Sequence, residues 1–100
     1  MQEASVLRLS VAHEQGSTVL YAAGEIDITT APQLREVLDH WGGVVVDLAD
    51  VTFLESQGVA VLIAAQKRFA EHGGDLRLRK PQGSVRRALQ LVGIDSWIDG

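Results

Sequence analysis

Cysteine is absent from this 100-residue sequence, which excludes disulfide bonds, thiolate metal sites and cysteine nucleophiles. Long apolar runs are absent as well, because the longest, residues 59–65, is far short of the roughly 20 residues that a membrane span needs. The first ten residues lack a basic segment followed by an apolar one, so no secretory signal is predicted. We expect a cytoplasmic protein of one domain, residues 1–100, since this length leaves no room for a second core.

Net positive charge is also lacking, which argues against a nucleic-acid partner. The formal net charge is −4, with nine acidic and two basic residues in residues 1–55 but four acidic and seven basic residues in residues 56–100. Phe69 is the only aromatic residue within the basic stretch 67–87, so that stretch has no series of side chains on which bases could stack. We therefore interpret the basic residues as solvated surface, with neither nucleic acid nor membrane as partner.

Several segments have the hydrophobic pattern of strands. Residues 6–13 alternate apolar and polar side chains, and residues 18–24 read as a second strand after a turn at Gly16, which predicts an antiparallel hairpin. Residues 43–49 form a continuous, mostly β-branched run that is typical of a strand covered on both faces. Residues 75–79 alternate again and are predicted to form a short strand.

Between these strands, apolar residues recur at helical spacing. A first helix is predicted to begin near Thr30 and Pro32, a second to span residues 57–72 and stop at Gly73 and Gly74, and a third to span residues 83–93 with Ser84 as its cap. The order β-β-α-β-α-β-α predicts an α/β fold, with a mixed sheet of four to five strands covered by helices. Residues 94–100 are ambiguous and add either a last strand or a turn.

Ser56 stands between the strand 43–49 and the second helix, and its side chain suits three roles. As a helix cap it would accept a hydrogen bond from a backbone N–H, although Val59 leaves no capping box. As the nucleophile of a small serine hydrolase it lacks the G-x-S-x-G motif, and the only later histidine is His72. As a switch it would carry a phosphate, which the start of a helix tolerates because free N–H groups and the helix dipole favour anions.

Other residues beside this serine have two interpretations. Gly58 provides close backbone approach for another molecule, or it only suits the local turn. Asp47 and Asp50, which we place in a loop leading to the serine, extend an acidic docking surface or only keep that loop soluble. Phe53 and Leu54 are predicted to be core anchors.

No metal or cofactor site is predicted. The three histidines, His13, His40 and His72, form no cluster with the spacing of metal ligands. Trp41 and Trp97 are interpreted as packing residues rather than as part of a cofactor site.

Four segments, in this order and spacing, resemble the STAS-domain anti-sigma factor antagonists of bacteria: GEIDITTAPQL, VVVDLADVTFLESQGVAVLIAAQKRF, GGDLRL and SVRRALQLVGID. The resemblance covers residues 6–97. It implies a protein that is not an enzyme but binds an anti-sigma factor, itself a serine kinase, and so releases the sigma factor. It also implies that this kinase ends the interaction by phosphorylating a serine with ATP, and that a PP2C-type phosphatase reverses the modification.

The family motif Asp-Ser-Ser/Thr-Gly falls on residues 55–58, so the resemblance makes Ser56 the phosphate acceptor. Glu55 replaces the aspartate and Gln57 replaces the second hydroxyl residue, and both departures bear on recognition by the kinase. By the same resemblance Asp27 lies near the serine and shapes the partner surface; the alternative is that it only stabilises the turn before the first helix. The expected partner-binding residues are Asp27, Glu55, Ser56, Gln57 and Gly58.

The acidic excess of residues 1–55 fits this interpretation, since an acidic patch around Ser56 would steer a partner with basic residues. One alternative keeps the fold and changes the task, to a regulatory subunit of a lipid-transport ATPase or of a stress-signalling complex. A small serine hydrolase is the remote alternative.

Overall fold

Four strands form one mixed sheet in the order β1-β2-β3-β4 in the computed structural model, which describes residues 5–99. The first two strands pair antiparallel, and the last two run parallel to the second. Their bounds are β1 Leu7–Glu14, β2 Ser17–Ile26, β3 Val44–Leu54 and β4 Leu76–Arg79. The predicted hairpin is confirmed, with its turn at Gln15 and Gly16, both of which have positive φ angles.

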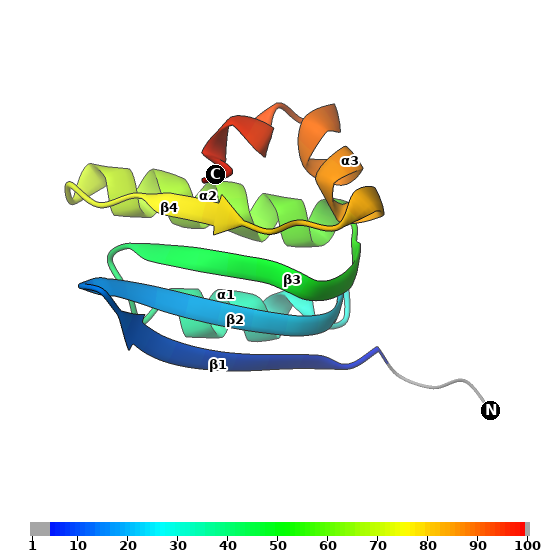
Figure 1. The fold of residues 1–100 in the computed structure, drawn as a ribbon, viewed down its shortest axis with the longest axis horizontal. Helices are drawn as coiled ribbons and strands as arrows, with labels where there is room; N and C mark the ends of the chain where they lie inside the picture. The colour runs from blue at the N-terminus through cyan, green and yellow to red at the C-terminus, as the bar shows by residue number, and fades with distance from the viewer. Residues whose placement is uncertain (1–4, 100) are drawn as a thin grey trace.

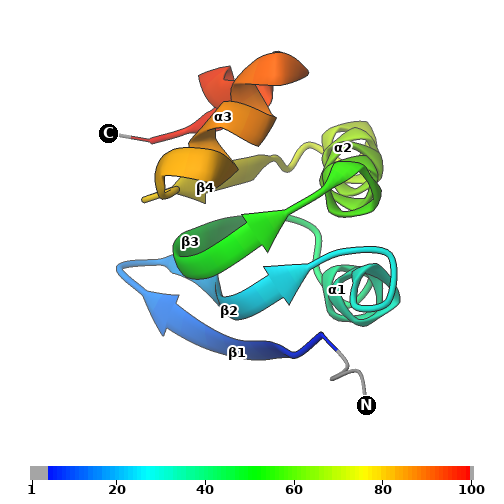
Figure 2. The same cartoon turned by 90° about the vertical axis from the view of Figure 1, so that its right-hand side faces the viewer.

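Two helices cover one face of the sheet, and a third lies at the β4 end (Figures 1 and 2). The helices are α1 Ala31–Leu38, α2 Ser56–Glu71 and α3 Gly83–Leu91, followed by a 3-10 turn, η1, Ile94–Trp97. After η1, Ile98 forms a single parallel bridge with Leu78 of β4, so the chain end adds a bridge rather than a fifth strand. The predicted α/β fold and its β-β-α-β-α-β-α order are confirmed.

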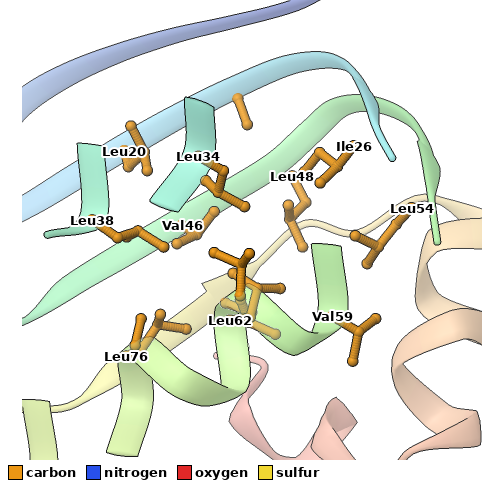
Figure 3. Close-up of a cluster of buried hydrophobic side chains, with 14 of the residues drawn as sticks. Leu20, Ile26, Leu34, Leu38, Val46, Leu48, Leu54, Val59, Leu62 and Leu76 are labelled. Carbon is orange, nitrogen blue, oxygen red and sulfur yellow. The ribbon is translucent and has the colours of Figure 1, made fainter. Parts of the chain in front are cut away.

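The core fills the space between the sheet and helices α1 and α2 (Figure 3). Each fully buried Leu, Val or Ile side chain contributes about 1.5–3 kcal/mol relative to an exposed one, so this layer fixes the strand ends that carry the loops. Trp41 and Trp97 are half-buried against the core, which confirms them as packing residues. The fully buried side chains include Leu20, Ile26, Leu34, Leu38, Val46, Leu48 and Leu62.

Strand β3 is longer than predicted, and this overturns two expectations. It continues to Leu54 because its pairing with β2 contains two register shifts, which absorb extra residues. Asp50 therefore lies within the strand rather than in a loop; Asp47, which the predicted strand already contained, also lies within it and is buried. Leu54 is a core residue as predicted, but Phe53, the next residue along the pleat, faces the other side of the sheet and is 45% exposed.

The serine cap predicted for α3 is wrong, and Ser56 does not fill the first of its three possible roles, that of a cap for α2. Glu55 and Gln82 occupy the N-cap positions, so Ser56 is the first residue of α2 and Ser84 the second residue of α3. Thr30 does precede α1, but its hydroxyl donates to the Glu25 carbonyl oxygen at 2.8 Å instead of capping the helix.

The predicted glycine stop of α2 is confirmed. Gly73 has a φ of 82°, and its N–H donates to the Ala70 carbonyl at 3.2 Å, while the Gly74 N–H donates to the Phe69 carbonyl at 2.9 Å. These two bonds form a Schellman motif, which satisfies carbonyls that a helix end would otherwise leave free.

The other face of the sheet carries a polar network with one residue from each strand. The Arg79 guanidinium donates to Asp47 at 2.7 Å, to the Tyr21 hydroxyl at 2.8 Å and to Glu14 at 3.4 Å. The Tyr21 hydroxyl also hydrogen-bonds to Glu14. Arg79 is therefore a structural residue, and the prediction that all basic residues are solvated surface was wrong for it.

Candidate functional site

The candidate site lies where β2 and β3 end. Because these strands are parallel, their carboxyl ends meet at one edge of the sheet, and the chain passes from them into α1 and α2 (Figure 2). Asp27 follows β2, and Glu55 and Ser56 follow β3. The Glu55 N–H donates to the Ile26 carbonyl at 3.0 Å, which joins the two strand ends directly.

Asp27 organises the turn between β2 and α1. Its Oδ1 accepts hydrogen bonds from the Thr29 N–H at 2.9 Å, the Thr29 hydroxyl at 2.7 Å and the Thr30 N–H at 3.1 Å. Its Oδ2 accepts a hydrogen bond from the Ser5 hydroxyl. These bonds, with that from Ser5 first, lower the pKa of Asp27 to about 2. These contacts stabilise the turn before α1, which is the alternative role that the sequence analysis gave to Asp27.

Glu55 connects the same turn to α2. Its carboxylate Oε1 accepts a hydrogen bond from the Ile28 N–H at 2.6 Å and makes no cap bond to α2. From the sequence, Glu55 was expected to be a partner-binding residue that replaces the aspartate beside the serine, and neither its contact with the loop nor Ile28 was predicted. The extra methylene relative to aspartate was the one available signal of a longer reach.

Ser56 and Gln57 are exposed in the first turn of α2. The carbonyl of Glu55 accepts from the N–H groups of Gly58 and Val59, at 3.0 and 3.1 Å, whereas the two preceding N–H groups have no acceptor within the helix. Within residues 5–99 the Ser56 hydroxyl makes no hydrogen bond, and its neighbours present an uncapped helix start, which favours anions.

A catalytic pairing of Ser56 with the later histidine is excluded by the fold. Ser56 begins α2 and His72 caps its other end, so a helix of 16 residues separates them. That length corresponds to roughly 24 Å, far beyond hydrogen-bond reach. His72 therefore cannot act as the general base for Ser56, as the hydrolase alternative would require.

Gly58 is buried in the first turn of α2, where it packs against the core beneath Ser56 and Gln57. A Cβ atom there would lie 2.4 Å from Cγ2 of Ile26 and 2.7 Å from Cδ1 of Leu54. One expectation was that the missing side chain lets another molecule approach the backbone of Gly58. The groups that approach it are instead core side chains of the protein itself. Glycine at this position thus lets α2 begin directly against the ends of β2 and β3.

The surface around Ser56 combines apolar and acidic groups. Ile28 is 65% exposed in the loop fixed by Asp27 and Glu55. Phe53 is exposed next to the last residue of β3, on the sheet face opposite to the helices. Glu25 is exposed next to the last residue of β2, whereas Asp50 is exposed further back along β3, where it pairs with Ala23. A partner surface that carries cations and an apolar patch would complement this composition.

The described residues form neither a metal-binding cluster nor a helix that could span a membrane. Among residues 5–99, no three His, Asp or Glu side chains lie together as the ligands of a metal ion would. In the same part of the chain, every helix is too short or too polar to cross a bilayer.

Comparison with known proteins identifies the family. The family model described as "Mlab, STAS domain" matches residues 9–99. The anti-sigma-F factor antagonist RsfB of Mycobacterium tuberculosis is 35% identical over 96 residues, which cover 89% of this chain and 76% of the relative. The anti-sigma-B factor antagonist of Bacillus subtilis is 28% identical over 97 residues, covering 93% and 89%. This chain belongs to the STAS-domain family.

Solved structures agree with the fold. The anti-sigma factor antagonist SpoIIAA in its unphosphorylated form superposes with a TM-score of 0.79 at 21% identity, covering 94% of this chain and 86% of the other. An anti-sigma factor antagonist from Mycobacterium paratuberculosis gives the same TM-score at 29% identity, covering 93% and 83%. The family resemblance in the sequence is confirmed, and these relatives are named as regulatory proteins rather than as enzymes.

Proposed function

We propose that this protein is a cytoplasmic anti-sigma factor antagonist that binds an anti-sigma factor with serine kinase activity and thereby releases the sigma factor. The observation that carries the proposal is the exposed Ser56, whose hydroxyl makes no hydrogen bond within residues 5–99 and which is the first residue of α2; the family resemblance makes this position the phosphate acceptor. RsfB, at 35% identity, is named as an anti-sigma-F factor antagonist. The proposed contact surface consists of Asp27, Glu55, Ser56 and Gln57, with Gly58 packed beneath them.

The proposed control is phosphorylation of Ser56. A phosphate would add about −1.5 to −2 charges to a surface that is already acidic, and the start of α2 can hold it without refolding. A loss of about 3 kcal/mol at the contact would weaken binding by roughly two powers of ten. A PP2C-type phosphatase would restore the binding form. SpoIIAA, a protein of the same fold, has been solved in a phosphorylated form.

A direct test is to incubate the protein with purified bacterial anti-sigma kinases, ATP and Mg²⁺ and to locate phosphate by mass spectrometry. We expect label on Ser56 that Ser56→Ala abolishes. Ser84→Ala is the matched control, because Ser84 is also exposed in the first turn of a helix and should leave labelling unchanged. Binding of Ser56→Asp to the same partner as tightly as wild type would contradict the charge switch.

A second candidate function is that of a regulatory subunit in a lipid-transport ATPase or a stress-signalling complex. The departures from the family motif at Glu55 and Gln57 favour it, because both flank the phosphate acceptor. The matching family description also names the domain without naming a sigma factor. Stable copurification with a transport ATPase, together with no labelling of Ser56 by any anti-sigma kinase, would decide for this candidate.

A further inference from the structure

We propose that Glu55 is a positioning residue that locks the β2–α1 loop against the start of α2, so that Ile28 and Ser56 form one preset contact surface. The inference rests on the proposed function for its partner, and on the contacts of Glu55 for its mechanism. It assigns to Glu55 a role in building the surface rather than in touching the partner through its charge.

Glu55 holds the loop with both its main chain and its side chain. The Glu55 N–H donates to the Ile26 carbonyl at 3.0 Å, and the Glu55 carboxylate accepts from the Ile28 N–H at 2.6 Å. Asp27 lies between these two anchors and binds the N–H groups of Thr29 and Thr30 on the other side. The segment between β2 and α1 is therefore fixed at each successive residue.

The contact of Glu55 with Ile28 joins residues 27 positions apart and is a charge-assisted hydrogen bond, because a carboxylate accepts from the N–H. Its geometric consequence is to place Ile28, a large apolar side chain that is 65% exposed, next to the residue that precedes Ser56. An apolar group held in one place loses less conformational entropy when a partner covers it, and binding is tighter for that reason.

Glutamate suits this role better than the aspartate of the family motif. An aspartate at an N-cap position accepts a hydrogen bond from its own helix, at its second or third N–H. Glu55 occupies the N-cap position of α2 but makes no cap bond, and its longer side chain reaches the neighbouring loop instead. In Glu55→Asp we therefore expect the shorter carboxylate to turn to the start of α2 and to release Ile28.

The first test uses the free protein and measures exchange of the Ile28 amide hydrogen by NMR. In Glu55→Ala and Glu55→Asp we expect exchange to quicken about tenfold, as for loss of one hydrogen bond of this kind. Glu55→Gln should stay within about threefold of wild type, because the amide oxygen still accepts from the same N–H. Unchanged exchange in Glu55→Ala would overturn the proposal, whatever partner the protein has.

The second test measures affinity for the anti-sigma factor that labels Ser56. Glu55→Ala and Glu55→Asp should each weaken binding about tenfold, and Glu55→Gln should restore it to within about threefold. Ile28→Ala should weaken binding in the wild type but add little in Glu55→Ala, because the two residues act together. If Glu55→Gln binds as poorly as Glu55→Ala while its Ile28 amide stays protected, the carboxylate charge meets the partner directly and the positioning role is wrong.

The two tests separate this inference from the proposed function. If no anti-sigma factor binds the wild-type protein, the proposed function fails, and the Ile28 amide measurement still decides whether Glu55 locks the loop. Urea unfolding of each variant guards against a global effect, since a variant that is still folded without urea shows a cooperative transition with the wild-type slope, even where its midpoint is lower.

Discussion

The network around Arg79 predicts a large loss of stability from one substitution on β4. Asp47 is a charged side chain that is only 6% exposed, and Arg79, itself 24% exposed, is its partner at 2.7 Å. In Arg79→Met the apolar stem of the side chain is kept and the guanidinium is lost. Asp47 is then left buried with a single hydrogen bond, from the Ala49 N–H at 3.0 Å.

The size of the effect follows from the loss of one partner of a buried ion pair, which typically costs 3–5 kcal/mol. Because Arg79 is partly exposed, we expect the lower end of that range, about 3 kcal/mol. For a domain of this size each kcal/mol lowers the melting temperature by about 4–8 °C, so the expected fall is roughly 10–25 °C. The loss is a large share of a total stability of about 5–15 kcal/mol.

The loss should also depend on pH. Burial raises the pKa of Asp47, but the hydrogen bonds from Arg79 and the Ala49 N–H and the charge of Arg79 outweigh it, so the pKa is lowered overall. In wild type this carboxylate therefore stabilises the fold above its unfolded pKa, and the contribution is lost as pH falls through the folded value. In Arg79→Met the guanidinium no longer opposes the effect of burial on the pKa of Asp47. Protonation of Asp47 then removes the free-energy cost of an unpaired buried charge. The difference between the two proteins should thus be largest at pH 7 and shrink towards pH 4.

Urea unfolding at pH 7 and pH 4 measures these quantities. Arg77→Met is the matched control on the same strand, because Arg77 pairs with Asp99 at the surface, where such pairs contribute about 0–1 kcal/mol. The double variant Asp47→Leu, Arg79→Met removes both charges and should recover most of the lost stability. A loss in Arg79→Met no greater than that in Arg77→Met would refute the view that Asp47 is an ion held in the sheet by Arg79.

Three further predictions concern the site. Gly58→Ala should destabilise the fold by about 1–3 kcal/mol in urea unfolding, because the new Cβ would overlap core side chains, whereas Gly83→Ala, with no atom within 4 Å, should be within about 0.5 kcal/mol of wild type. Ser56→Ala should change stability by less than about 0.5 kcal/mol, and a loss near 1 kcal/mol would mean that its hydroxyl caps the helix after all. The Thr29 amide should lose protection from hydrogen exchange as pH falls from about 4 to about 2. The pKa of Asp27, about 2, lies below its unfolded value, so the stabilisation from this carboxylate is lost as it is protonated. Asp27→Asn should lack this pH dependence.

The elements that the sequence predicted well are those with strong local patterns. The hairpin at Gly16, the parallel strand order and the stop of α2 at Gly73 each follow from side-chain periodicity or from a residue that accepts a positive φ angle. The length of β3 could not be predicted in this way. A buried aspartate in an apolar run looks like the end of a strand, and its partner Arg79 lies 32 residues further along the chain.

The position of the site could be predicted, but its construction could not. Ser56 follows from a motif of four adjacent residues, whereas the contact of Glu55 with Ile28 joins two turns that only the parallel pairing of β2 and β3 brings together. The expected serine cap failed for a related reason. A serine near the start of a helix can be either the cap residue or the first helical residue. Here the cap position is Glu55, one residue before Ser56.

The residues of the motif divide by what the fold requires of each. Gly58 is held against the core, and Glu55 and the neighbouring Asp27 fix the turns on either side of the strand ends. Gln57 and Ser56 both have side chains that are exposed and without a hydrogen bond among the described residues, and of the two only Ser56 carries a hydroxyl. A charge added to its hydroxyl would therefore break no contact that supports the domain, and its effect would fall on whatever protein covers that surface.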